Sequence, residues 1–160
     1  MACNITLIVY ILTLILIYIK MSEIPNCFYR TSIKGLVLNE DLKFLLCKEA
    51  KWVRELPGGG LDHGERVDLW LRREFEEEMG VAVGDIAKNP SYFITFINGK
   101  KQPAANVVYQ VSCDIAKILN FKSSDECVEV WFFNIEEASK LNLLPNVKEF
   151  IKVFDPTNHQ

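Results

Sequence analysis

A glycine-rich loop that leads into a glutamate-rich amphipathic segment constrains this chain more than any other feature. Residues 58–60 are three consecutive glycines, and they precede a segment, residues 67–79, that has an apolar residue at every fourth position. These apolar residues are Val67, Leu71, Phe75 and Met79. At 3.6 residues per turn, this spacing places them in one stripe of an α-helix. The segment is therefore predicted to be a helix that packs on a core through this stripe.

The ends of this helix also have sequence signals. Gly80 predicts the end, because glycine readily adopts the left-handed conformation that follows many helices. Asp62, followed three residues later by Glu65, resembles a capping box and predicts the start.

Three glutamates share one side of the predicted helix. Glu74, Glu77 and Glu78 are spaced i, i+3 and i+4, and Glu78 lies about 20° from Leu71, at the edge of the apolar stripe. Like charges repel at this spacing, so a cation is expected between them. Arg73 could pair with Glu77 at i+4, or a hard divalent ion such as Mg²⁺ or Mn²⁺ could bind the carboxylates. The residues alone leave both alternatives open.

The complete spacing from Gly59 to Val81 is G-x5-E-x7-R-E-U-x-E-E-x-G-U, in which U is a bulky apolar residue. This pattern resembles the Nudix box and fills every defined position of it. The resemblance implies a hydrolase that splits a diphosphate linked to another moiety, usually in a nucleoside diphosphate derivative. It also implies a requirement for Mg²⁺ or Mn²⁺ as cofactor.

The resemblance assigns metal ligands to four positions of the chain. Glu74, Glu77 and Glu78 match the metal carboxylates of the family, and the carbonyl of Gly58 matches its backbone ligand. The three glycines would let backbone carbonyls approach the same ion.

The catalytic residues that the resemblance implies are less uniquely assigned. Glu65 and Arg73 match residues that support and orient the carboxylate cluster. Family members differ in the acid that serves as general base. Glu77, Glu78 and Glu126 are the candidates here, and the sequence does not choose among them.

The fold class follows from the order of the expected elements. Strands are expected at residues 28–38, 43–47, 52–56, 92–97, 106–113 and 129–134, and further helices at 135–141 and 146–154. The order of strands and helices indicates an α/β protein. The resemblance implies an α/β/α sandwich with a mixed β-sheet between helices.

Composition limits the partners. The 160 residues suit one domain, and the net charge of −3 argues against binding to a nucleic-acid polymer. The expected partner is a small-molecule nucleotide, with monomer and homodimer both open. The five cysteines form no CxxC motif, which favours free thiols in a reducing compartment such as the cytoplasm.

Residues 1–20 differ from the remainder of the chain. Residues 2–19 carry no charge, and such a run is at the lower limit for a membrane-spanning helix. A membrane anchor is one interpretation. The other is that residues 1–20 are translated upstream sequence and that the protein begins at Met21. In either case the expected hydrolase domain is residues 21–160.

The substrate is the least determined property. A nucleoside triphosphate or a nucleotide sugar is expected, and the aromatic side chains that could stack on a base are Trp52, Phe93, Phe96, Tyr109 and Phe121. The alternative is a catalytically inactive Nudix-fold module that only binds a nucleotide or metal. Such a module would be expected to lack a carboxylate of the box, and none is missing.

Overall fold

The computed structural model describes residues 28–159 of the chain. Its strands are β1 (Arg30–Leu36), β2 (Phe44–Lys48), β3 (Arg54–Glu55), β4 (Val83–Ile86), β5 (Tyr92–Ile97), β6 (Pro103–Cys113) and β7 (Glu129–Phe133). Its helices are α2 (Val67–Met79), α3 (Ile115–Leu119), α4 (Ile135–Ser139), α5 (Pro145–Val153) and the 3₁₀ helix η1 (Pro156–His159).

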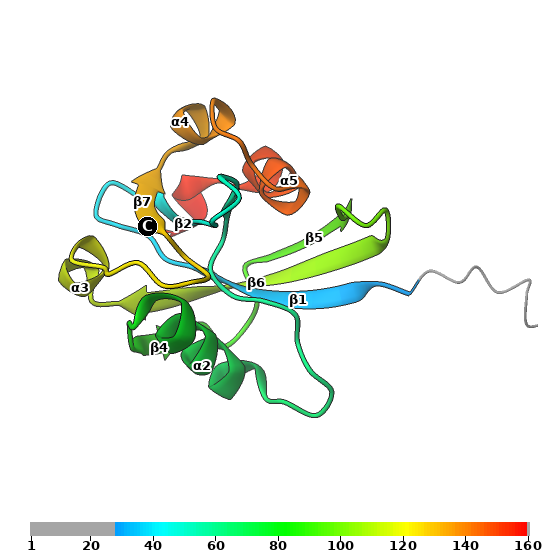
Figure 1. The fold of residues 1–160 in the computed structure, drawn as a ribbon, viewed down its shortest axis with the longest axis horizontal. Coiled ribbons are helices and arrows are strands. Elements are labelled where there is room, and N and C mark those ends of the chain that lie inside the picture. Colours follow the sequence, from blue (N-terminus) through cyan, green and yellow to red (C-terminus); the bar gives the residue numbers. More distant parts are fainter. Residues whose placement is uncertain (1–27, 160) are drawn as a thin grey trace, which may run out of the picture.

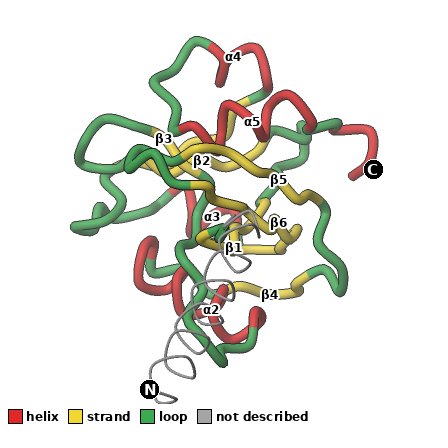
Figure 2. The backbone as a smooth tube through the Cα atoms, turned by 90° about the vertical axis from the view of Figure 1, so that its right-hand side faces the viewer, coloured by secondary structure: helices red, strands yellow, loops and turns green. Residues whose placement is uncertain are grey.

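The elements form three layers. Helix α2 lies on one side of the strands, and α4 and α5 lie on the other side (Figures 1 and 2). The expected α/β/α arrangement is confirmed. The strands are divided between two sheets: β1, β6 and β4 with β5 on β6, and β3, β2 and β7. The first sheet is mixed, because β1 and β6 are parallel while β4 and β5 run antiparallel to β6.

Strand β2 shows how the sequence fills both faces of the sandwich. Phe44 and Leu46 belong to the core beneath α5, whereas Leu45 and Cys47 belong to the core beneath α2. Successive side chains of a strand point to opposite faces, so a strand that is buried on both sides is apolar throughout. This explains the continuous apolar run Phe44–Cys47.

Helix α2 packs as its apolar spacing predicts. Leu71, Phe75 and Met79 are buried, and Val67 is half-buried against the same core. Trp70 is also buried, although it lies outside the expected stripe. The stripe is therefore wider than the four-residue repeat indicates.

The prediction for the end of α2 is confirmed, and that for its start is wrong. Gly80 follows the helix with a φ of 64°, in the left-handed region. The N-cap is Arg66, with no side-chain cap, so Asp62 lies four residues before it. The backbone N–H of Glu65 instead donates to the carbonyl of Asp62, which makes a tight turn.

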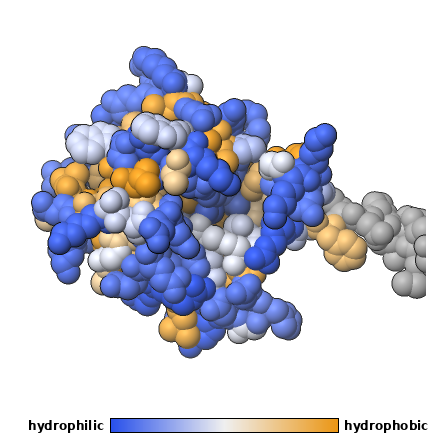
Figure 3. Space-filling model, viewed as in Figure 1, coloured by the Kyte–Doolittle hydropathy of each residue, from blue (hydrophilic) through white to orange (hydrophobic). Residues whose placement is uncertain are grey.

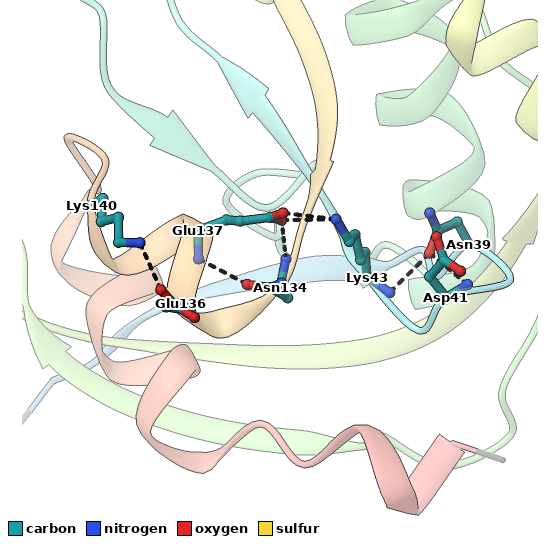
Figure 4. A network of polar contacts seen from close by, with 7 residues as sticks. All are labelled: Asn39, Asp41, Lys43, Asn134, Glu136, Glu137 and Lys140. Carbon is teal, nitrogen blue, oxygen red and sulfur yellow. Dashed lines mark hydrogen bonds and ion pairs between the residues drawn. The ribbon is translucent and has the colours of Figure 1, made fainter.

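A capping box does occur at α4, where it also attaches the helix to the second sheet (Figure 4). The Asn134 side chain accepts from the N–H of Glu137, and the Glu137 carboxylate accepts from the N–H of Asn134. The same carboxylate accepts from Lys43 Nζ at 2.8 Å. The backbone N–H of Lys43 donates in turn to the side chain of Asn39, in the turn between β1 and β2.

Strand β4 and helix α3 were not expected from the sequence. Both are short, and Gly84 and Asp85 interrupt the apolar pattern of β4. Pairing with β6 stabilises β4 nonetheless. No helix among residues 28–159 is long and apolar enough to cross a membrane. The expectation for residues 1–20 lies outside the described residues.

Candidate active site

The glycine loop runs along β1, which fixes the position of its backbone. The N–H of Ile33 donates to the carbonyl of Gly59 at 3.0 Å, and the N–H of Gly35 donates to the carbonyl of Pro57 at 2.9 Å. Gly58, between them, has a φ of 110°, and a Cβ at this position would lie 2.5 Å from the Ile33 carbonyl oxygen. Only glycine fits here without strain. The backbone of the loop is thus held in place along the edge of β1.

Two carboxylates of α2 approach this edge. The N–H of Gly58 donates to Glu78 Oε2 at 3.0 Å. A Cβ on Gly59 would lie 3.0 Å from Glu74 Oε2, so Glu74 also lies next to the loop. The i, i+4 spacing on α2 is what brings both carboxylates to the same stretch of backbone.

Arg73 forms ion pairs with three glutamates of the motif. Its guanidinium contacts Glu77 at 2.7 Å, Glu74 at 2.9 Å and Glu65 at 3.5 Å. The expected i, i+4 pair of Arg73 and Glu77 is therefore present. The Glu77 side chain is 54% exposed and lies beside Arg73, so it does not line the cleft described next.

A cleft of about 510 Å³ opens over the loop and the two carboxylates. Its lining includes Gly58, Glu74, Glu78 and, from the loop before β7, Asp125 and Glu126. Glu126, a candidate base, thus faces the same cleft as Glu78. Figure 3 shows one face of the molecule as mostly hydrophilic, with hydrophobic residues in several separate places.

The donors in the cleft suit a hard divalent ion. Glu74, Glu78 and Gly58 line the same cleft and offer carboxylate and carbonyl oxygens, and oxygen is the ligand that Mg²⁺ and Mn²⁺ prefer. Within residues 28–159, no three His, Cys, Asp or Glu side chains are grouped closely enough to hold a metal. Glu77 is directed to Arg73, and its predicted role as a metal ligand stays a prediction.

Comparison with known proteins identifies the family. The model of the NUDIX domain matches residues 28–154, which is most of the chain. The chain belongs to the Nudix family. No curated protein matches it.

Solved structures support the same fold. The MutT protein from Methanosarcina mazei Go1 has a TM-score of 0.62 and 24% identity, over 84% of this chain and 99% of that one. A UDP-X diphosphatase has a TM-score of 0.59 and 16% identity, over 86% of this chain and 64% of that one. An ADP-ribose pyrophosphatase from Streptococcus suis 89-1591 has a TM-score of 0.51 and 20% identity, over 78% of this chain and 86% of that one.

Burial changes the acidity of the Nudix-box carboxylates. It raises the pKa of Glu78 from 4.5 to about 7, and the Lys34 ammonium and the Gly58 N–H oppose this shift. Burial also raises the pKa of Glu74, against the effect of Arg73. Desolvation disfavours the charged carboxylate, and the nearby cations compensate only in part. In the absence of metal, Glu78 therefore titrates near neutral pH.

Lys34 lines the cleft but was not among the candidates that the sequence suggested. Its side chain is buried, and Nζ contacts Glu55 Oε1 at 2.6 Å and the carbonyl oxygen of Gly58. A lysine is rarely buried without a charged partner. Its place between Ile33 and Gly35 in an otherwise buried strand was the signal that could have revealed it.

A second, smaller pocket adjoins the cleft of the Nudix box. It has a volume of about 220 Å³ and shares Ser32 and Glu55 with the cleft. Asn106, only 1% exposed, lines it, and neither atom of its amide has a hydrogen-bond partner among the described residues. Phe96 also lines this pocket.

Of the aromatic residues proposed for stacking, Phe96 alone lines this second pocket. Trp52 and Phe93 are 72% and 67% exposed, and Trp52 lies under Lys48 Nζ. Tyr109 and Phe121 pack against the core beneath α2.

Proposed function

We propose that this Nudix domain hydrolyses a phosphoanhydride bond in a nucleoside diphosphate derivative, with Mg²⁺ or Mn²⁺ as cofactor. The observation that carries the proposal is the convergence of Glu74 and Glu78 on the backbone of Gly58 and Gly59, in an open polar cleft. Gly58, Glu74 and Glu78 would hold the metal. When bound, it would supply charge neutralisation for the diphosphate and a more acidic water.

The protein groups around this site have separate tasks in the proposed reaction. Arg73 holds Glu74 in place and keeps Glu65 and Glu77 beside it. Glu78 lines the cleft and accepts the Gly58 N–H, which places its carboxylate beside the proposed reaction site and makes it one candidate for general base. Glu126 lines the cleft from the opposite loop and is the second candidate for general base. Glu77 is the weakest of the three candidates, since it lies outside the lining.

The second pocket is suited to the heterocycle of the substrate. The amide of Asn106 offers one donor and one acceptor face, which complement the paired donor and acceptor edge of a nucleobase. Phe96 supplies an aromatic surface for stacking. Since the pocket shares Ser32 and Glu55 with the cleft, one substrate can place its base here and its diphosphate near Glu78.

A panel of nucleoside triphosphates, nucleotide sugars and dinucleotides, assayed by phosphate and nucleotide release, tests the proposal. We expect turnover of at least one compound with Mg²⁺ or Mn²⁺, complete loss with chelator, and recovery when metal is restored. Metal should also raise the melting temperature, because it binds the folded state. Turnover that survives exhaustive chelation would contradict the metal assignment. Nucleotide binding without any turnover would favour the inactive module.

Asn106→Leu is expected to weaken substrate binding without weakening the fold. Loss of two hydrogen bonds to a base should raise KM by roughly tenfold or more and change kcat less. The free energy of unfolding should stay equal or increase, because a buried amide without partners is replaced by an apolar group of similar size. The measurements are steady-state kinetics and urea unfolding.

Asn89→Leu, an exposed amide, is the matched control and should alter neither quantity. If Asn106→Leu unfolds more easily and keeps its KM, the amide has a structural role only.

We place the protein in a reducing compartment such as the cytoplasm. Cys47, Cys113 and Cys127 are free thiols, and burial raises the pKa of Cys113 to about 11, which makes it unreactive.

A further inference from the structure

Lys34 is a buried lysine that lines the cleft. It is 2% exposed, and its ammonium lies between Glu55 and the carbonyl of Gly58. Its charge lowers the pKa of Glu49, Glu74 and Glu78, although burial raises all three. One buried cation thus acts on three of the carboxylates that line the cleft.

The peptide of Gly58 is held from both sides. Its N–H donates to Glu78 Oε2 at 3.0 Å, while its carbonyl oxygen accepts from Lys34 Nζ. This carbonyl is also the backbone ligand of the proposed metal site. The ammonium and a divalent ion repel each other, so they cannot both lie close to this oxygen.

Lys34 has a second partner that does not depend on Gly58. Its ammonium contacts Glu55 Oε1 at 2.6 Å, and this carboxylate is fixed by a hydrogen bond of 2.8 Å from Asn146 Nδ2 at the start of α5. The lysine can therefore release the Gly58 carbonyl and remain paired inside the protein.

We propose that Lys34 is a built-in cation that holds the Gly58 carbonyl in the metal-free site and releases it to the incoming metal, with Glu55 as its remaining partner. This inference rests on the proposed metal site. Lys34 is then a positioning residue: it keeps the loop and carboxylates arranged before metal binds. Its positive charge also weakens metal binding, because the ion must displace it.

The first test follows the lysine directly in the wild-type protein. In ¹⁵N-lysine-labelled protein, a buried, hydrogen-bonded ammonium gives an Nζ signal that is resolved from those of exposed lysines. Titration with Mg²⁺ alone should shift this signal, with saturation at the metal-binding midpoint obtained by calorimetry. A signal that moves only when a nucleotide is added would overturn the inference and make Lys34 a substrate ligand.

The second test compares Lys34→Met with Lys51→Met. Lys51 is exposed and lines the same cleft, so its substitution removes the same charge without altering Gly58. In calorimetric titrations with Mn²⁺, Lys34→Met should bind roughly tenfold more tightly than wild type. Lys51→Met should change the affinity less than about twofold. In chelator, Lys34→Met should melt at a lower temperature.

The outcomes separate the inference from the proposed function. If wild-type protein binds no Mn²⁺ at millimolar concentration, the metal site itself is wrong. If wild type binds Mn²⁺ and Lys34→Met binds it equally or less tightly, only the role of Lys34 is wrong. Should Lys34→Met fail to fold, the Mg²⁺ titration of the wild-type Nζ signal decides alone.

Discussion

Glu78→Gln is expected to reduce kcat by roughly three orders of magnitude or more while leaving the fold intact. Glu78 is the carboxylate nearest the Gly58 backbone, and its oxygen accepts the Gly58 N–H. A glutamine keeps the size and an accepting oxygen, so the loop retains its contact. The negative charge that would bind the metal or accept a proton is lost. Steady-state kinetics with the best substrate of the panel measure this effect.

The same variant should be more stable than wild type in chelator at alkaline pH. Burial raises the pKa of Glu78 from 4.5 to about 7. The folded protein is stabilised by protonation of Glu78. This contribution is complete below the pKa of Glu78 in the unfolded chain and is lost as the pH rises through about 7, its pKa in the folded protein. The difference in unfolding free energy between Glu78→Gln and wild type should therefore grow by about 2 to 3 kcal/mol from pH 4 to pH 8. Urea unfolding across this range measures it.

Glu76→Gln is the control for both effects. Glu76 lies on the exposed side of α2, two residues before Glu78, and its substitution should change kcat and stability little. Equal losses of activity in the two variants would show that the cleft face of α2 is wrongly assigned. A stability difference that does not vary with pH would mean that Glu78 is not protonated in the metal-free protein at neutral pH.

Gly58→Ala is expected to destabilise the protein by roughly 3 kcal/mol or more and to remove metal-dependent activity. A φ of 110° is unfavourable for alanine, and its Cβ would lie 2.5 Å from the Ile33 carbonyl oxygen. That oxygen belongs to the backbone of a buried strand and cannot move aside easily. The loop must shift instead, and the Gly58 carbonyl then leaves its position beside Glu78. Urea unfolding and Mn²⁺ calorimetry provide the measurements.

Gly64→Ala is the control that separates the effect of a positive φ from the steric clash with the Ile33 carbonyl oxygen. Gly64 also has a positive φ, 86°, but a Cβ there meets nothing within 4 Å. This variant should lose about 1 kcal/mol and remain active. If Gly58→Ala and Gly64→Ala lose equal stability and both keep activity, the close approach of the loop to β1 has no functional role.

The sequence by itself determined the family, the α/β/α fold and the course of α2. These properties depend on local spacing: apolar residues every fourth position bury one face of α2, and Gly80 ends it in the left-handed conformation. The Nudix box likewise indicated the candidate metal ligands and catalytic residues, because its residues lie on one loop and one helix. The predicted start of α2 was wrong, because Asp62 and Glu65 form a tight turn in the loop and do not cap the helix.

Only the tertiary structure decided which groups meet in the cleft. Lys34 lies 24 residues before Gly58 in the sequence, and its contacts with Gly58 and Glu55 depend on the glycine loop running along β1. The pocket of Asn106 likewise requires β1, β6 and the start of α5 to lie together. Burial is a property of the packed molecule, so the buried ammonium and the raised pKa of Glu78 arise only when the layers assemble.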